Sequence, residues 1–267
     1  MSTFVIGDVH GRREQLRRLV EMLPRDPGTD ALVLLGDLID RGEDVPGVVE
    51  EVISLQRAAS APGAGAPVIV LRGNHEQMML DFLDGGATLW LHSAVGSHRT
   101  FEQYVGHELY VLTEEDFDGA RGELARAVPA SHVEFFRGMP LYHEDEYAIY
   151  VHAGLAEGKH PRDTAPHHLL WTRDAEFFKY YYGKPCVFGH TPAPLLPLLG
   201  RLGRHGIYIA HSAIGIDTGY TPPCPLTCLQ LPEFVLYQTY ADGRDATHHI
   251  TSFIPEALQA FRGEASV

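Results

Sequence analysis

Residues 3–11 read TFVIGDVHG, a short apolar run that leads directly to Asp8 and His10. The same pattern returns in residues 32–42, LVLLGDLIDRG, where the apolar run leads to Asp37. Continuous apolar runs of this length are typical of strands that are buried on both faces. Side chains that follow such strands lie beyond their carboxyl ends, where open α/β sheets bind ligands. The pattern therefore predicts an α/β fold with a polar site at one sheet edge.

Three further apolar runs end in the same way. They cover residues 68–71, 148–151 and 186–188, and the polar side chains that follow them are Asn74, His75, His152 and His190. A lone histidine is more often a core or surface residue than a ligand, but five matched strand ends argue against coincidence. Glycines in these turns permit tight bends and close backbone approach. The remaining histidines of the 16 in the chain are interpreted as solvated surface residues.

Helical patterns separate the first three runs. Leu16, Leu19 and Leu23 share one helix face, and Asp44 with Pro46 predicts the start of a second helix. This alternation of strands and helices favours an α/β sandwich. We expect residues 1–267 to form a single domain.

The second half of the chain continues this pattern after a helical stretch. Residues 77–138 contain no strand pattern, so we interpret them as a helical insertion in which Thr113 caps one helix. Further strands are predicted at 207–209, 226–231 and 234–240, and a short helix after Pro255.

Composition excludes several classes of protein. The chain is 45% hydrophobic and carries a formal net charge of −14, which argues against disorder and against a broad nucleic-acid surface. It has no secretory leader pattern and no apolar run near the ~18 residues that span a bilayer, so we expect a cytoplasmic protein without membrane contact. Its three cysteines are expected to be small buried apolar residues.

The strand-end side chains limit the chemistry of the site. Carboxylate, amide and imidazole are present without thiolate, and the six candidates are Asp8, His10, Asp37, Asn74, His152 and His190. This mixture suits Mn²⁺, Fe or Zn²⁺ better than the all-oxygen sites of Mg²⁺ or Ca²⁺. Six side chains are too many for one four-coordinate metal but fit two metals that share a carboxylate. Asp37, at the middle strand end, is placed to be shared.

The motifs also resemble a known family. They are DVHG at 8–11, GDLIDRG at 36–42, GNHE at 73–76, VHAG at 151–154, LWTR at 170–173, GHT at 189–191 and IDTG at 216–219. In this order they resemble the signature of the calcineurin-like metallophosphoesterases. More narrowly, they are similar to the phosphoprotein phosphatase branch, with bacterial and bacteriophage Ser/Thr phosphatases and symmetrical diadenosine tetraphosphatases. The resemblance covers most of residues 3–231 and implies a β-sandwich flanked by helices (α-β-β-α) with a helical insertion.

The resemblance also implies roles for the residues of the site. A first metal would bind Asp8 and His10, with Asp37 as the bridge. The side chains implied for the second metal are Asn74, His152 and His190. A hydroxide that bridges the metals would attack phosphorus. Together the metals make a locally positive pocket in an acidic protein, which attracts a phosphate dianion.

The remaining motif residues would handle the substrate. By the resemblance, His75 is the general acid that protonates the leaving group, and Asp40 orients it. Arg41 and Arg173 would hold the phosphoryl oxygens, with Asn74 beside them. Trp171 is expected in the core, and Asp217 is expected to stabilise a turn behind the site.

Three functions remain open for this site. The first is a Ser/Thr protein phosphatase, including a dual-specificity one, and the intact motif around Asp40 and Arg41 favours it. The second is a symmetrical hydrolase of diadenosine tetraphosphate. The third is a non-catalytic metal-binding scaffold, which the complete ligand set and His75 argue against. The stretches 90–96 and 220–225 depart from the family pattern, and we expect them to border the substrate cleft.

Overall fold

The computed structural model describes residues 1–110, 114–197, 201–202 and 205–259, and its strands form two six-stranded sheets. The strands of the first sheet are β1 (Thr3–Ile6), β2 (Ala31–Leu34), β3 (Val68–Val70), β10 (Leu226–Leu231), β11 (Val235–Thr239) and β12 (Asp245–His249). Those of the second are β4 (Tyr142–Glu144), β5 (Ile149–Val151), β6 (Cys186–Phe188), β7 (Arg201–Leu202), β8 (Tyr208–Ala210) and β9 (Ala213–Gly215). The strand orders are β12-β11-β10-β1-β2-β3 and β4-β5-β6-β9-β8-β7.

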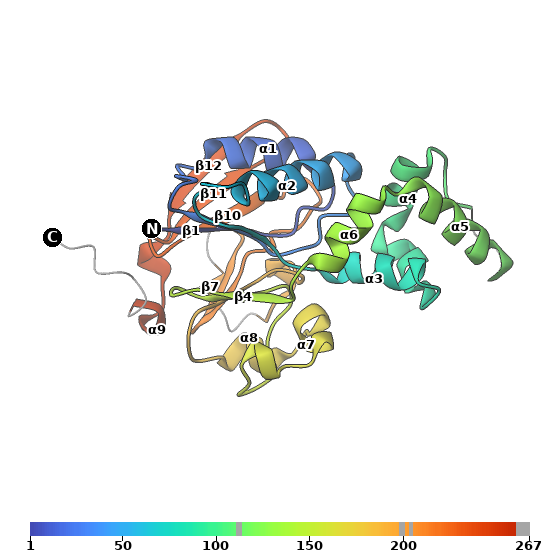
Figure 1. Ribbon diagram of the computed structural model, residues 1–267. Helices are drawn as coiled ribbons and strands as arrows, with labels where there is room; N and C mark the ends of the chain where they lie inside the picture. Colours follow the sequence, from blue (N-terminus) through green and yellow to red (C-terminus); the bar gives the residue numbers. More distant parts are fainter. Residues whose placement is uncertain (111–113, 198–200, 203–204, 260–267) are drawn as a thin grey trace.

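Helices cover the outer faces of both sheets. They are α1 (Arg13–Met22), α2 (Val45–Ala59), α3 (Asn74–Leu83), α4 (Ser97–Val105), α5 (Glu114–Ala127), α6 (Ala130–Gly138), α7 (Pro166–Trp171), α8 (Ala175–Tyr180) and α9 (Glu256–Gln259). Figure 1 shows α1 and α2 over the first sheet, α7 and α8 over the second, and α3 to α6 extending from one end. The layers therefore follow the predicted α-β-β-α order. Among the described helices, none is long and apolar enough to cross a membrane.

Alternate residues of the central strands enter different layers of the core. In β1, Phe4 and Ile6 pack with the apolar faces of α1 and α2, whereas Val5 packs between the sheets. In β6, Cys186 and Phe188 pack towards α8, whereas Val187 points between the sheets. Both faces of these strands are buried, as the continuous apolar runs predict. This burial fixes the register of each strand, and thereby where its final residue lies.

The register places three parallel strand ends together in each sheet. β1, β2 and β3 are parallel neighbours, and so are β5, β6 and β9. Six predicted strands differ from the observed ones by one residue at one or both ends, and β6 and β10 agree fully. The sequence analysis missed β4, β9, β12 and β7, of which β7 has only two residues. The first two have three residues each, and β12 alternates between exposed and half-exposed residues, so none carries a long apolar run.

Helix α2 begins where the sequence predicts it, whereas α3 begins at Asn74, three residues before the predicted start of the helical stretch. Asp44 caps α2 by accepting a hydrogen bond from the Gly47 amide, and Pro46 lies in the first turn. Within 77–138, the described residues hold helices α3 to α6 and two short 3₁₀ helices, η1 (Thr88–Leu91) and η2 (Ser93–Val95), and no strand. The predicted cap at Thr113 lies outside the described residues.

Two expectations about single residues need correction. His132 is not a solvated surface residue: it is buried, contacts Tyr104 through Nδ1 at 2.8 Å and Glu50 through Nε2 at 2.8 Å, and so ties α6 to α4 and α2. Among the cysteines, Cys186 and Cys228 are buried as expected, but Cys224 is only half-buried.

Candidate metal and phosphate site

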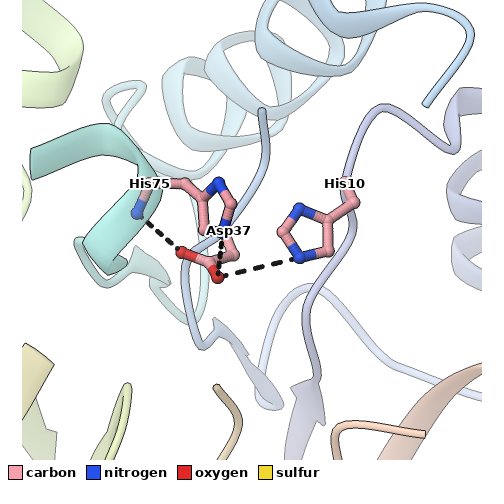
Figure 2. A group of neighbouring side chains, drawn as sticks. All are labelled: His10, Asp37 and His75. Carbon is pink, nitrogen blue, oxygen red and sulfur yellow. Dashed lines mark hydrogen bonds and ion pairs between the residues drawn. The ribbon is translucent and has the colours of Figure 1, made fainter. Parts of the chain in front are cut away.

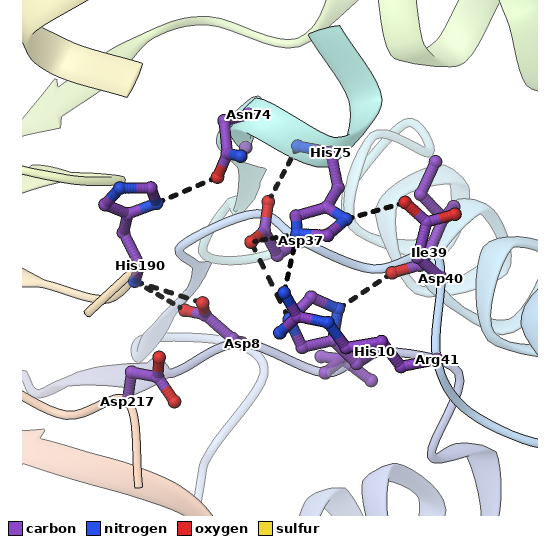
Figure 3. Close-up of polar contacts among 12 residues, drawn as sticks. Asp8, His10, Asp37, Ile39, Asp40, Arg41, Asn74, His75, His190 and Asp217 are labelled. Carbon is purple, nitrogen blue, oxygen red and sulfur yellow. Dashed lines mark hydrogen bonds and ion pairs between the residues drawn. The ribbon is translucent and has the colours of Figure 1, made fainter. Parts of the chain in front are cut away.

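The predicted site residues converge at the carboxyl ends of the parallel strands of both sheets. The side chains predicted as metal ligands are all at least 93% buried, and they are Asp8, His10, Asp37, Asn74, His152 and His190. We call these six residues the ligand cluster. Figure 3 shows the members other than His152 gathered around Asp37, although they come from positions 8 to 190 of the chain. The sandwich therefore brings together the strand ends that the sequence pattern selected.

Asp37 lies between two groups of imidazoles. Its Oδ2 is 3.7 Å from His10 Nε2 and 3.7 Å from His75 Nε2 (Figure 2). Its Oδ1 is 3.4 Å from His152 Nε2. Burial acts to raise the pKa of this carboxyl, but the neighbouring imidazoles, His152 first, outweigh burial and lower the pKa. Each carboxylate oxygen thus faces a different set of donors. This is the geometry that a bridging carboxylate requires.

His152, His190 and Asn74 have the donor arrangement of a cation site. His152 Nδ1 donates to the Leu35 carbonyl at 2.9 Å, and burial lowers the pKa of His152, so its Nε2 carries a lone pair. That nitrogen is 2.9 Å from Asn74 Oδ1, and His190 Nδ1 is 2.8 Å from the same oxygen. Ligand atoms on one metal at about 2.1 Å are separated by about 3 Å. The separations of both nitrogens from Asn74 Oδ1 are therefore those of ligand atoms on one cation.

The chemistry of His190 also fits a metal ligand. Its ring is buried, Nε2 has no hydrogen-bond partner in the described structure, and burial lowers its pKa to about 2. A neutral imidazole is the form that binds metals. One nitrogen atom each from His152 and His190 and one oxygen of Asp37 lie within 4.8 Å of one another. The residues present thus fit a divalent cation.

His10 and Asp8 are held by contacts with backbone groups, and His10 also lies against an arginine. His10 Nδ1 donates to the Ile39 carbonyl at 2.8 Å, which leaves Nε2 as an acceptor, and Arg41 Nη1 lies 2.8 Å from it. Asp8 does not contact His10. Its carboxylate instead accepts hydrogen bonds from the His190 amide at 3.0 and 3.2 Å. Burial, followed by the charges of Asp217 and Asp37, raises the pKa of Asp8, and a bound cation would relieve this crowding of carboxylates.

His75 and Asp40 form a buried hydrogen-bonded pair beside the cluster. His75 Nδ1 donates to Asp40 Oδ2 at 2.6 Å, and Asp40 is completely buried. Burial lowers the pKa of His75, but the Asp37 charge and the bond to Asp40 outweigh burial, so the net shift is upward. Nε2 of His75 points to the cleft, where Arg41 Nη2 lies 3.2 Å away. A protonated His75 could therefore donate a proton into the cleft from Nε2.

The cleft above the cluster has a volume of about 260 Å³. Its lining includes Arg41, Arg173, Trp171, Leu89 and His92. Both predicted arginines thus face it. Trp171 is half-buried: it packs against the edge of the first hydrophobic core, as expected, and also lines the cleft, with its ring 6.4 Å from that of His190.

Of the two loops that depart from the family pattern, the first lines this cleft and the second contacts Arg41. His92, Ala94 and Val95 line it from the first loop, and Tyr220 of the second loop packs on the Arg41 guanidinium, 4.9 Å from ring centre to Cζ. Asp217 accepts a hydrogen bond from the Gly219 amide at 2.8 Å, the turn that the sequence predicts.

The backbone is constrained where the site residues lie. Seven non-glycine residues of the described chain have positive φ, and five of them are His10, Asp37, Asp40, Arg41 and His190. Such conformations cost about 1–3 kcal/mol each and persist only where the surroundings enforce them. Gly189 illustrates the packing: a Cβ there would lie 2.1 Å from a carboxylate oxygen of Asp8. This explains why a glycine precedes His190.

Glu76 is a structural residue of the site to which the sequence analysis assigned no role. Its buried carboxylate accepts hydrogen bonds from the amides of Asp37 at 3.0 Å, Leu38 at 2.7 Å and Gly73 at 2.9 Å. It thereby joins the loop after β2 to the start of α3, and burial raises its pKa to about 7. The sequence did carry a signal for this role. Glu76 is the third residue of a helix that follows Gly73, and a glutamate at that position fits half of a capping box.

The comparisons with known proteins agree with this geometry. The profile of the calcineurin-like phosphoesterase family matches residues 1–208. A symmetrical bis(5'-nucleosyl)-tetraphosphatase of Dechloromonas aromatica is 30% identical over 156 residues, which cover 58% of this chain and 44% of that protein. Serine/threonine-protein phosphatase 1 of Salmonella typhimurium is 39% identical over 89 residues, or 33% of this chain and 36% of that protein. The matched region spans less than half the length of these curated relatives.

Solved structures share the fold at low sequence identity. The crystal structure of a proposed diadenosine tetraphosphatase superposes with a TM-score of 0.59 and 18% identity, over 92% of both chains. Together with the family profile, which covers most of the chain, these findings establish that the protein belongs to the calcineurin-like phosphoesterase family.

Proposed function

We propose that this protein hydrolyses phosphomonoesters with a pair of divalent metal ions, and that its substrates are phosphorylated proteins. The observation that carries the proposal is the position of Asp37, whose two oxygens face two separate groups of imidazoles. His75 and two arginines lie around the same cleft. The donor set of carboxylate, amide and imidazole favours Mn²⁺, with Fe or Zn²⁺ as alternatives.

The proposed residues divide the work between the two sides of the cleft. When bound, the metal pair supplies Lewis acidity and an activated water as the nucleophile. Arg41 and Arg173 hold the phosphoryl oxygens and stabilise the charge that spreads over them. His75 gives the proton on Nε2 to the leaving oxygen as the bond from phosphorus to that oxygen breaks, and Asp40 holds Nδ1 throughout. No side-chain nucleophile is required.

The size of the cleft supports a phosphorylated side chain as the substrate. A volume of about 260 Å³ accommodates a phosphoryl group and the side chain that carries it. A dinucleoside polyphosphate would extend well beyond this cleft. Such a substrate is nevertheless the second candidate, because the D. aromatica relative is a symmetrical tetraphosphatase.

The deciding experiment compares two substrates in the presence of saturating Mn²⁺. We expect kcat/KM for a phosphoserine peptide to exceed that for diadenosine tetraphosphate by at least about tenfold, or about 1.4 kcal/mol of transition-state binding. The reverse order would establish the second candidate. If neither substrate nor p-nitrophenyl phosphate is hydrolysed, the protein is a metal-binding scaffold.

A further inference from the structure

A stretch of the helical insertion contacts the site from outside the strand ends. Residues 90–100, which we call the cleft wall, include η2 and the first turn of α4. This stretch contains no predicted ligand or catalytic residue. It nevertheless makes hydrogen bonds to Asp40 and Arg41, which lie in the loop after β2.

The Asp40 carboxylate accepts a hydrogen bond from the cleft wall on each of its two oxygens. Thr100 Oγ1 donates to Asp40 Oδ1 at 2.6 Å, and the same hydroxyl accepts from the Asp40 amide at 2.9 Å. Trp90 Nε1 donates to Asp40 Oδ2 at 3.2 Å. The side chains of Asp40 and Thr100 and the whole of Trp90 are inaccessible to solvent. No water can replace these contacts, so the orientation of the carboxylate depends on the two side chains.

Thr100 also acts on the backbone of Asp40. Asp40 and Arg41 both have φ of +70°, a region that non-glycine residues rarely adopt. The Thr100 hydroxyl bridges the amide and the carboxylate of Asp40, so it fixes the main chain and the side chain of this residue together. The free oxygen lone pairs of the carboxylate then point at His75 Nδ1, 2.6 Å away.

The same stretch holds Arg41. The Arg41 amide donates to the Gly96 carbonyl at 3.1 Å, and Arg41 Nε donates to the Val95 carbonyl at 3.3 Å. Ser97 Oγ donates to the Trp90 carbonyl, which joins the two ends of the turn. The cleft wall is therefore a continuous hydrogen-bonded unit with Asp40 on one side and Arg41 on the other.

We propose that the cleft wall aligns the proton donor and the phosphate-binding arginine, and that Thr100 is a positioning residue for His75 through Asp40. The proposal rests on the proposed function, since His75 must protonate a leaving group for alignment to matter. Loss of the Thr100 hydroxyl would let the Asp40 carboxylate rotate, and proton transfer to poor leaving groups would slow. Substrates whose leaving group needs no proton would be spared.

The test uses Thr100→Val, which removes the hydroxyl and keeps the shape, in the full chain with Mn²⁺. We expect kcat for phenyl phosphate to fall about tenfold or more, a part of the 10²–10⁴-fold contribution of a general acid, and kcat for 2,4-dinitrophenyl phosphate to fall less than about twofold. Thr100→Ser, which keeps the hydroxyl, should have kcat values close to those of the wild type on both substrates. Thr239→Val is the matched control. Thr239, in β11, is a buried threonine whose hydroxyl donates to the Gln15 carbonyl of α1.

A second measurement separates this proposal from the proposed function. The proton between His75 Nδ1 and Asp40 should give a downfield ¹H NMR resonance that is absent in His75→Asn and shifted or lost in Thr100→Val. Equal losses of kcat on both phenyl substrates, or an unchanged resonance, would overturn the positioning role. If the wild-type protein hydrolyses no phosphoester, the proposed function fails, and the resonance alone then decides whether Thr100 positions the pair.

Discussion

The floor and the wall of the cleft are built in different ways. The floor is the ligand cluster, whose members follow strands that are buried on both faces and locked in register. The wall, residues 90–100, consists of a 3₁₀ turn and the start of a helix, held to Asp40 and Arg41 by individual hydrogen bonds. In our proposal the floor carries the metal chemistry, whereas the wall orients the residues that act on the substrate. Changes in the two regions should therefore have different signatures.

The largest effect is expected at the centre of the floor. Asp37→Asn removes the carboxylate that faces both imidazole groups, so the paired metal site should be lost and hydrolysis should fall by at least about 10³-fold. Elemental analysis would measure fewer than two metals per chain. Asp217→Asn is the control, because an amide oxygen can still accept from the Gly219 amide. Two metals retained in Asp37→Asn would place the bridge elsewhere.

A smaller loss is expected where the floor meets the wall. His75→Asn should reduce kcat for a phosphoserine peptide by about 10²–10⁴-fold, the scale of general acid catalysis. Metal content should not change, since the floor supplies the ligands. Steady-state kinetics with elemental analysis separates the two properties. A loss below tenfold on this poor leaving group would contradict the role of His75 as the acid.

The wall alone should affect substrate binding. A Cβ at Gly96 would lie 2.6 Å from Arg41 Cγ, so Gly96→Ala should displace Arg41. A charge-assisted hydrogen bond contributes about 1.5–3 kcal/mol, so KM should rise about tenfold or more while metal content is unchanged. Gly85→Ala is the matched control: both glycines have φ of +81°, but a Cβ at Gly85 has no neighbour within 4 Å. Equal KM values in the two variants would show that Arg41 does not depend on the wall.

The smallest effect on catalysis is expected at His132, in helix α6. His132→Ala removes the contacts of a buried imidazole with Tyr104 and Glu50, so the free energy of unfolding should fall by about 1–3 kcal/mol. Activity of the folded fraction should change less than about twofold. Urea denaturation of this variant and of His98→Ala, where the histidine is exposed, provides the comparison. A large loss of kcat without a loss of stability would mean that the insertion acts on the site through His132.

This contrast also explains what could be predicted from the sequence. Asp8, Asp37 and His190 could be selected as candidates from the sequence because burial on both strand faces leaves a continuous apolar run, and the candidate ligand lies in the turn that follows. The order of the strands within each sheet was not predictable, because a pairing such as that of β1 with β10 joins segments more than 200 residues apart. Trp90 lies in a stretch that the sequence marks as departing from the family pattern, but Thr100 gave no signal, since its contact with Asp40 depends on how residues 90–100 fold against the loop after β2. His132 was misassigned because a single buried histidine on a helix leaves no periodic pattern.

The hydrogen bonds of Glu76 have a consequence for the order in which the site forms. Its carboxylate holds the amides of Asp37, Leu38 and Gly73 with contacts that involve no metal. Fixing one residue of a flexible loop costs about 1–2 kcal/mol of conformational entropy. Because folding itself orders the loop, metal ions that enter the site do not have to bear that entropic cost. The affinity for metal is thus determined in part by an acid that need never touch the metal.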